Sequence, residues 1–255
     1  MDAKRIVVKV GSSTLTGDAG TSLNGSAVTK LVDVVANLKG QGKEVIIVTS
    51  AAIAAGMAPL GLTQRPTDLA TQQASASVGQ GLLIAKYSAE FTRHNIVASQ
   101  VLVTGDDLAR DLHKENAKRT LLRLLELGVV PIINENDSVG TEDIRLGDND
   151  RLAALVLQLI GADLLVLVSD IDALYDAPPT QAGANRIAKV TNFADLADIE
   201  IGGVGSSGVG SGGMVTKIQA AEIATSSGAR MLLTDLAHVE DALAGKDVGT
   251  LFTSN

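Results

Sequence analysis

Short apolar runs alternate with longer segments of helical periodicity along most of the chain, and this alternation narrows the fold more than any other feature. The predicted strands are 5–10, 44–49, 97–103, 129–134, 164–169 and 230–233, and the predicted helices are 25–40, 68–93, 114–127, 150–160 and 214–227. Several strands are apolar almost throughout, such as 164–169 with LLVLV before its final serine, which is typical of strands covered on both faces. The alternation predicts an α/β fold with a mainly parallel sheet and helices on both faces. Ligands of such sheets usually bind beyond the carboxyl ends of the strands, so residues there are the first candidates for a site.

The composition excludes several kinds of site and partner. The 255 residues include no cysteine, which rules out disulfides, thiolate zinc sites and cysteine nucleophiles. The three histidines, His94, His113 and His238, have no metal-ligand spacing, and we expect none of them to be catalytic. A net charge of −8 without a cluster of Lys and Arg argues against binding to nucleic acid or to a membrane surface, and it suits a cytoplasmic protein.

Neither the N-terminus nor the most apolar run has the pattern of a targeting signal or a membrane span. The N-terminus, MDAKRIVVKVGSS, lacks the long apolar segment and small-residue cleavage site of a signal peptide. The most apolar long run, 152–168, is interrupted by Gln158 and by Gly161-Ala162-Asp163. It therefore predicts a helix, a turn and a buried strand rather than a membrane span.

Lys9 stands near the end of an otherwise apolar strand, VVKV, and a glycine turn follows at Gly11. A buried lysine is costly unless it is paired or faces a ligand. One interpretation is an edge strand with Lys9 in solvent. The other places its ammonium group beside the backbone N–H groups of Gly11 and Ser12, where a phosphate could bind.

A glycine-rich run, GGVGSSGVGSGG at 202–213, precedes a predicted helix that carries Lys217. By composition it could be a flexible linker. Its match to G-x-G-x-x-G at 208–213 is weak because no strand precedes it, and the spacing to Lys217 does not fit a Walker A loop. Glycine amides, a helix N-terminus and a lysine nevertheless converge here, so we favour an anion-binding loop over a linker.

Two polar clusters, NEND at 134–137 and GDND at 147–150, follow or precede predicted elements at the same edge of the sheet. An EF-hand is excluded because no bidentate Glu ends the loop. Asp148–Asp150 could simply cap the helix that follows. Two such clusters at one sheet edge instead suggest recognition of an amino group and a carboxylate, with Lys9 and Lys217 supplying the positive charge for a phosphate.

These motifs, in this order and spacing, resemble the glutamate 5-kinases of the amino acid kinase family. They are VVKVGSS at 7–13, VTSAAIAAG at 48–56, SVGQ at 77–80, INEND at 133–137, GDND at 147–150, SDIDALY at 169–175, GSGGMVTK at 210–217 and GTLF at 249–252. The pairing of INEND with GDND is far more specific than any single glycine loop.

The resemblance implies a three-layer αβα sandwich with an open, mainly parallel sheet. It implies one amino acid kinase domain over 1–255, with a glutamate-binding half of about 1–160 and a nucleotide-binding half of about 161–255. The implied reaction is phosphorylation of the γ-carboxylate of L-glutamate by ATP with Mg²⁺, the first step of proline biosynthesis. It also implies a homo-oligomer, a dimer or tetramer, with proline as a feedback inhibitor.

By matching position, the resemblance assigns three groups of site residues. The catalytic group is Lys9, Lys217 and Asp150, and the glutamate-binding group is Ser50, Asn134, Asp137, Asp148 and Asn149. The nucleotide-binding group is Lys9, Gly11, Ser169, Asp170, Ser211, Gly212, Gly213, Met214, Val215, Thr216 and Lys217. No residue is assigned as a metal ligand.

The chain departs from the family pattern at three residues and at its C-terminal end. Ala51 and Ala173 stand where glycine is usual, and Pro178 stands where an aspartate is common. Because a Cβ disfavours positive φ, Ala51 is expected to restrict the approach of a ligand to the backbone. The sequence also ends before the C-terminal PUA domain of many members. Two alternatives remain: a related kinase with another acid substrate, or a non-catalytic amino-acid-binding regulatory protein, which Ala51 and Ala173 keep open.

Overall fold

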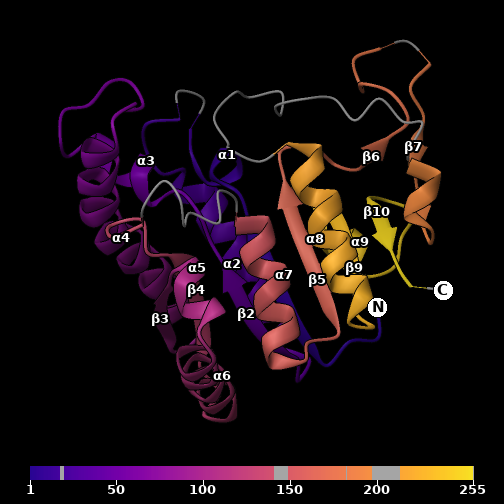
Figure 1. Ribbon diagram of the computed structural model, residues 1–255, viewed down its shortest axis with the longest axis horizontal. Coiled ribbons are helices and arrows are strands. Elements are labelled where there is room, and N and C mark those ends of the chain that lie inside the picture. Colours follow the sequence, from indigo (N-terminus) through magenta and orange to yellow (C-terminus); the bar gives the residue numbers. More distant parts are fainter. Residues whose placement is uncertain (18–19, 141–148, 182, 197–212, 255) are drawn as a thin grey trace.

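A central β-sheet organises the computed structural model, which describes residues 1–17, 20–140, 149–181, 183–196 and 213–254. Its strand order within these residues is β3-β4-β2-β1-β5-β9-β10-β8 (Figure 1). The strands are β1 (Arg5–Val10), β2 (Glu44–Val48), β3 (Ala98–Val103), β4 (Val130–Glu135), β5 (Leu164–Ser169), β8 (Lys189–Val190), β9 (Arg230–Asp235) and β10 (Thr250–Phe252). Among the described strands of this sheet, the β9–β10 pair is antiparallel and the others are parallel.

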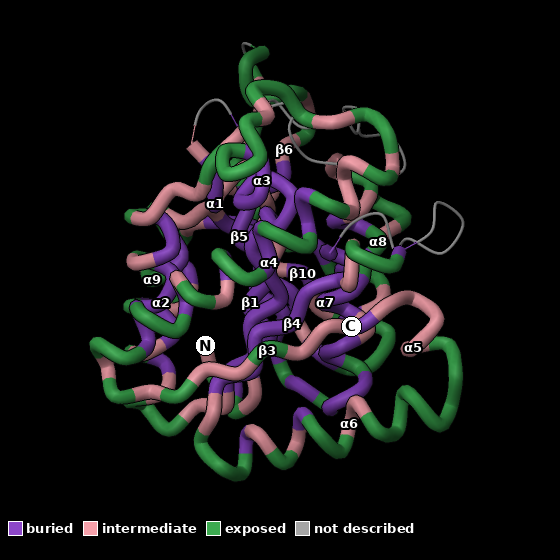
Figure 2. Tube along the Cα trace, turned by 90° about the vertical axis from the view of Figure 1, so that its left-hand side faces the viewer, coloured by how far each residue is buried: buried purple, intermediate pink, exposed green. Residues whose placement is uncertain are grey.

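Helices cover both faces of the sheet, which confirms the three-layer arrangement. One face carries α1 (Ser12–Leu15), α2 (Gly25–Gly40), α3 (Ala52–Met57), α4 (Leu69–Thr92) and α9 (Val239–Leu243). The other carries α6 (Asp111–Glu126), α7 (Asn149–Ile160) and α8 (Met214–Ser226). Neighbouring residues of β1 point to opposite faces, so Ile6 and Val8 pack in one core and Val7 in the other. Figure 2 shows the buried strands running through the middle of the molecule.

The position of β1 decides between the two interpretations of Lys9. β1 lies between β2 and β5, and Lys9 is level with Val48 on one side and Leu167 on the other. The interpretation that placed Lys9 on an edge strand in solvent is therefore wrong. An interior strand with a buried lysine at its carboxyl end requires a partner for that charge.

Capping residues explain where the main helices begin and end. The Asn24 side chain accepts hydrogen bonds from the N–H groups of Ser26 and Ala27 at the start of α2, and Asp68 accepts one from Thr71 at the start of α4. Gly42, Gly128, Gly161 and Gly228, just past the ends of α2, α6, α7 and α8, have positive φ. The predicted boundaries of the long elements are confirmed to within a few residues.

The apolar run at 152–168 divides as predicted: α7 ends at Ile160 and β5 begins at Leu164. In the described part of the chain, no helix combines the length and the apolar character needed to cross a membrane. The remaining elements are short and were not predicted. They are α5 (Gly105–Ala109), the 3-10 helix η1 (Phe193–Leu196) and a two-stranded sheet of β6 (Leu174–Tyr175) and β7 (Arg186–Ile187).

Candidate active site

Two lysines from different elements meet one carboxylate beyond the carboxyl end of β1. The Nζ atom of Lys9 lies 2.5 Å from Oδ1 of Asp150, and the Nζ atom of Lys217 lies 3.1 Å from Oδ2. We call these three residues the lysine–carboxylate cluster. Lys9 comes from β1, Asp150 from the first turn of α7 and Lys217 from the first turn of α8. The predicted catalytic residues are thus brought together.

All three residues of the cluster are buried. Lys9, Asp150 and Lys217 are 5%, 1% and 7% exposed. Burial raises the pKa of Asp150, but the positive charges of Lys9 and Lys217 outweigh burial and hold this pKa well below its usual range. Two ammonium groups at one carboxylate concentrate positive charge here, which favours the approach of an anion.

The N-terminus of α8 lies next to this charge. Gly213 is the N-cap residue and has no side chain to satisfy the first N–H groups of the helix. The Thr216 hydroxyl lies 2.8 Å from the carbonyl oxygen of Gly213 and 3.2 Å from Oδ2 of Asp150. Met214 and Val215 occupy the same turn, whereas Ser211 and Gly212 lie outside the described residues. A helix terminus beside two lysines suits a phosphate group.

Gly11 lies close to the Lys9 ammonium: a Cβ added at Gly11 would be 3.6 Å from Nζ of Lys9. Its N–H group points to the carbonyl oxygen of Val168 at 3.4 Å, a long hydrogen bond across the sheet edge. The predicted phosphate seat at Gly11 therefore has its lysine in position, but its N–H group is directed at the neighbouring strand.

A second group of polar side chains surrounds Asn149, the residue before Asp150. Its Nδ2 atom lies 2.6 Å from the carbonyl oxygen of Thr49, 2.9 Å from Oγ of Ser50 and 2.9 Å from Oδ1 of Asn134. The Nδ2 atom of Asn134 in turn donates to Oε1 of Gln80 at 2.9 Å. Three predicted glutamate-binding residues, Ser50, Asn134 and Asn149, are thereby brought into contact. We call Gln80, Asn134 and Asn149 the amide chain.

Three further predicted residues, Asp137, Ser169 and Asp170, lie at or just after the carboxyl ends of β4 and β5. Asp137 is half-buried in the turn after β4, and its N–H donates to the carbonyl oxygen of Glu135 at 2.9 Å. At the carboxyl end of β5, the Ser169 hydroxyl donates to Asp170 at 3.0 Å. Asp148 lies outside the described residues. The structure thus puts Asp137 and Ser169 on strand ends of the same sheet edge, on opposite sides of β1.

Ala51 has a backbone conformation that alanine rarely adopts. It has φ +79° and ψ 10°, is the N-cap residue of α3 and is buried. Left-handed backbone costs an L-residue with a Cβ about 1–2 kcal/mol. Ala51 therefore adopts the backbone conformation that its Cβ disfavours, and the strain lies directly beside Ser50.

Sequence reasoning missed Gln80. The motif SVGQ at 77–80 contributed to the resemblance, but no role was assigned to its glutamine. The available signal was an amide on the buried side of a helix, directly after a glycine. Its partner Asn134 lies 54 residues further along the chain, so only the folded structure reveals the contact.

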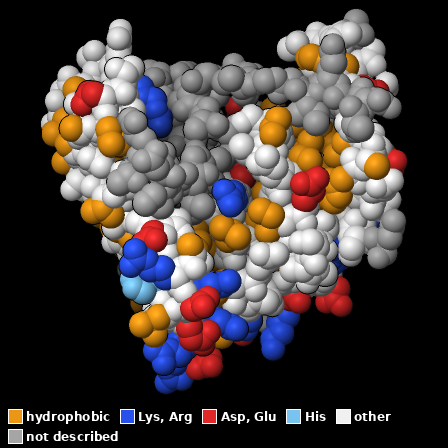
Figure 3. Space-filling model, in the orientation of Figure 1, with side chains coloured by type: hydrophobic (Ala, Val, Ile, Leu, Met, Phe, Trp, Pro, Cys, Tyr) orange, Lys and Arg blue, Asp and Glu red, His pale blue; other side chains and the backbone are white. Residues whose placement is uncertain are grey.

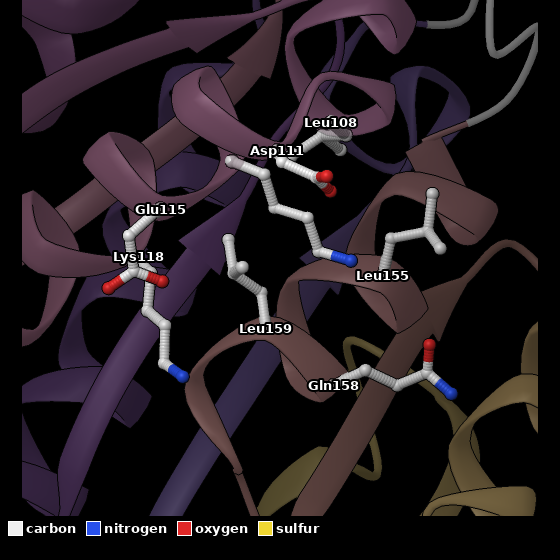
Figure 4. A pocket seen from close by; sticks show the side chains of 8 residues that line it. Leu108, Asp111, Glu115, Lys118, Leu155, Gln158 and Leu159 are labelled. Carbon is white, nitrogen blue, oxygen red and sulfur yellow. The ribbon is translucent and has the colours of Figure 1, made fainter.

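A cavity of about 530 Å³ lies between α6 and α7 (Figure 4). It is lined by Leu108, Asp111, Lys114, Glu115, Lys118, Leu155, Gln158 and Leu159, none of which belongs to the lysine–carboxylate cluster or the amide chain. Its charged residues come from α6, over which acidic and basic side chains intermix in Figure 3. Such a mixture is typical of a solvated helix face.

No group of three metal-ligating side chains is present among the described residues. Both oxygens of Asp150 face lysine ammonium groups. Each histidine pairs with an aspartate: His94 with Asp33, His113 with Asp107 and His238 with Asp235.

Comparisons with known proteins identify the family of the chain. A model of the amino acid kinase family matches residues 4–235. The chain is 57% identical over 251 residues to a glutamate 5-kinase of Streptomyces coelicolor, covering 98% of this chain and 67% of that relative. It is 54% identical over 250 residues to a glutamate 5-kinase of Clavibacter michiganensis, covering 98% of this chain and 94% of that relative.

Solved structures share the fold at low sequence identity. A carbamate kinase from Giardia lamblia bound to AMP-PNP has a TM-score of 0.70 at 16% identity and covers 99% of both chains. A UMP kinase from Bacillus anthracis has a TM-score of 0.64 at 14% identity, covering 99% of this chain and 97% of the other. At these identities the similarity establishes the architecture alone.

Proposed function

Because the chain belongs to the amino acid kinase family, we propose that it phosphorylates the γ-carboxylate of L-glutamate with ATP and Mg²⁺. The product is γ-glutamyl phosphate, and the reaction opens proline biosynthesis. The substrate rests on the glutamate 5-kinases that resemble the chain over 98% of its length.

One observation carries the proposal: consecutive residues of α7 join the two polar groups. Asn149 contacts Ser50 and Asn134, whereas Asp150 contacts Lys9 and Lys217. A carboxylate held by the first group would lie next to a phosphate held by the second. Transfer between bound anions needs this proximity above all.

The chemistry suits the residues that are present. A carboxylate with a pKa near ~4.3 is already ionised at neutral pH, so the nucleophile needs no general base. The barrier comes from positioning and from repulsion between anions, which Lys9 and Lys217 offset. Asp150, ionised and between them, holds both ammonium groups in place. Mg²⁺, bound to the phosphates of ATP, would supply further neutralisation, as is usual for this ion.

Each predicted site residue keeps its proposed role. Ser50, Asn134, Asp137, Asp148 and Asn149 hold glutamate; Gly11, Ser169, Asp170 and the segment Ser211–Lys217 hold the nucleotide. The first group belongs to the half of about 1–160, and most of the second to the half of about 161–255. The position of β1 between β2 and β5 supports this division, since Lys9 then borders both halves.

We further propose a cytoplasmic homo-oligomer that proline inhibits. Light scattering would give the number of subunits, and a dimer or tetramer is expected. Titration with proline at subsaturating glutamate should lower the rate.

A hydroxylamine trap tests the reaction directly, because hydroxylamine converts an acyl phosphate into a detectable hydroxamate. The protein is incubated with ATP and Mg²⁺ and with L-glutamate, N-acetylglutamate or aspartate, and UMP, which has no carboxyl group to form a hydroxamate, serves as the blank. A hydroxamate signal with glutamate alone is expected. A signal with another acid instead would mean that the chain is a related kinase of the same family with a different acid substrate. No signal from protein that still binds glutamate would favour a non-catalytic regulatory role.

A further inference from the structure

The direction of the amide chain is fixed at one end by a backbone carbonyl. The carbonyl oxygen of Thr49 can only accept, so Asn149 must turn its NH₂ group toward it. Asn134 must then present its oxygen to Asn149 and its NH₂ group to Gln80, and Gln80 must present its oxygen to Asn134. The orientation of all three amides follows from this one acceptor.

The chain ends in a buried donor. Gln80 is 8% exposed, and among the described residues its Nε2 atom has no hydrogen-bond partner. A buried unpaired donor costs on the order of 1–3 kcal/mol. A function of the Gln80 amide oxygen, which accepts from Asn134, would explain why this costly residue is present.

Gln80 is held rigidly because α4 packs unusually close to α3. A Cβ added at Gly79 would lie 1.8 Å from the carbonyl oxygen of Ala52, and one added at Gly56 would lie 1.9 Å from that of Ser75. The two helices therefore touch through their backbones. The residue after Gly79 is fixed relative to α3 and to the Ser50–Ala51 turn that precedes α3.

The same face of α4 makes two further polar contacts with the sheet edge. Residues 73, 80 and 87 are seven apart and so share one side of the helix. The Nε2 atom of Gln73 donates to the carbonyl oxygen of Gly140 at 3.0 Å, in the loop that follows Asp137. The Tyr87 hydroxyl lies 3.0 Å from Oγ1 of Thr49. α4 thus makes hydrogen bonds to the segments that follow β2 and β4.

We infer that Gln80 is a positioning residue for the acceptor site, acting through Asn134. This inference rests on the proposed function. Gln80 accepts a hydrogen bond from the NH₂ group of Asn134 and so keeps the Asn134 oxygen directed at Asn149. This contact in turn keeps the NH₂ group of Asn149 beside the hydroxyl of Ser50. Without it, Asn134 can rotate, and the amide that faces the acceptor carboxylate loses its fixed orientation. Nucleotide binding, which uses the other side of α7, is not affected.

The test compares Gln80→Met, which keeps the length and removes the oxygen, with Ser75→Ala as a matched control. Ser75 is a fully buried residue of α4 whose hydroxyl has no partner among the described residues. Gln80→Met is expected to raise the KM for glutamate about tenfold, the size of one lost hydrogen bond. The KM for ATP should stay within about twofold, and Ser75→Ala should change neither constant.

A double-mutant cycle separates positioning from packing. In an Asn134→Ala background, Gln80→Met should change the KM for glutamate by less than about twofold, because its route of action is gone. The inference is wrong if Gln80→Met still raises the KM for glutamate about tenfold in the Asn134→Ala background. It is also wrong if Gln80→Met raises the KM values for glutamate and for ATP equally. Gln80→Asn, whose shorter side chain cannot reach Asn134, replaces Gln80→Met in the cycle if the latter does not fold, with the same expectations.

The failure of this inference is distinguishable from failure of the proposed function. If the unaltered protein forms no hydroxamate from glutamate, the proposed function fails first. If it does, and a folded Gln80 variant keeps the unaltered KM for glutamate, the inference about Gln80 alone is overturned.

Discussion

At the scale of single residues, the lysine–carboxylate cluster places two buried lysines on one buried carboxylate. One lysine would neutralise Asp150, yet Lys9 and Lys217 both contact it within the protein interior. Burying a charge is costly even when it is paired, so two buried ammonium groups at one carboxylate are a burden for stability. A ligand that supplies negative charge makes this arrangement favourable.

Lys217→Ala should therefore separate activity from stability. Removing one electrostatic stabiliser of the transferred phosphate should lower kcat on the order of 100- to 1,000-fold. The free energy of unfolding should change little, because the contact between Lys9 and Asp150 remains. Steady-state kinetics and urea unfolding measure the two quantities.

Lys246→Ala is the matched control for that experiment. Lys246 is exposed and pairs with Asp241 at 2.7 Å, so its loss should leave kcat unchanged. Near-normal turnover of a folded Lys217→Ala protein would disprove the role assigned to Lys217.

Ala51 stores strain beside the proposed acceptor site. Its φ of +79° costs an alanine more than a glycine, and the smaller entropy loss of alanine on folding offsets only part of that cost. Ala51→Gly should therefore raise the free energy of unfolding by about 0.5–1 kcal/mol. Thermal or urea unfolding would measure it.

Ala54→Gly serves as the comparison because Ala54 lies in the same helix, buried and without the positive φ. There glycine should lower the free energy of unfolding by about 1 kcal/mol. If both substitutions destabilise equally, the backbone at Ala51 is not strained.

At the scale of elements, α2 and α4 are joined by a cluster of charges around Glu90. Its carboxylate lies 2.7 Å from Nζ of Lys86 and 2.5 Å from Arg93, which in turn lies 3.7 Å from Asp33 of α2. Hydrogen bonds from Lys86 and then Arg93 lower the pKa of Glu90 to about 2. The pKa of this carboxyl is thus below its ordinary value in the folded protein.

The lowered pKa gives a pH-dependent contribution to stability. Stabilisation by Glu90 should be complete above pH 4.5 and should disappear as the pH falls from 4.5 toward about 2. Glu90→Gln should therefore lower the free energy of unfolding at pH 7, and its difference from the unaltered protein should shrink over that range. Denaturant unfolding at several pH values would measure it.

Lys86→Met provides the check on the cause, since it removes the first partner of Glu90. The pH dependence of the Glu90→Gln difference should be smaller in that background. A difference that is the same at every pH would show that packing, not ionisation, is lost in Glu90→Gln.

The long elements could be predicted because their own residues determine them. Strands such as β5 are apolar almost throughout, and α2 has its cap at Asn24 and buries a continuous apolar side. The short elements depend on distant partners instead. β10 has three residues and pairs with β9, where Leu251 lies opposite Leu232, so no local pattern identifies it.

The same distinction applies to the site. Lys9 was conspicuous as a lysine in an apolar strand, and Asp150 and Lys217 followed motifs at helix starts. The contacts that unite them join residues 67 or more positions apart. The role of α4 could not be predicted, because it depends on the hydrogen bonds that link Gln80 through Asn134 to Asn149. These bonds, and which group donates in each, are defined only in the folded structure.

At the scale of the whole molecule, the proposed halves meet along β1 and the start of α7. The strands β2 and β4 lie on one side of β1, and β5 and β9 lie on the other. Asn149 contacts the first side and Asp150 contacts β1 and α8. The two substrates should therefore stabilise different parts of the sheet and share one segment.

Hydrogen–deuterium exchange can test this division. Glutamate alone should slow exchange at the carboxyl ends of β2 and β4 and in the neighbouring turn of α4. A non-hydrolysable ATP analogue should slow it at the end of β5 and in the first turn of α8. The first turn of α7 should be protected by either ligand, and most by both together. The α6 helix, whose apolar residues Leu121 and Leu125 are buried but whose surface is charged, serves as the internal reference. Protection of α8 by glutamate alone would mean that the halves are assigned to the wrong substrates.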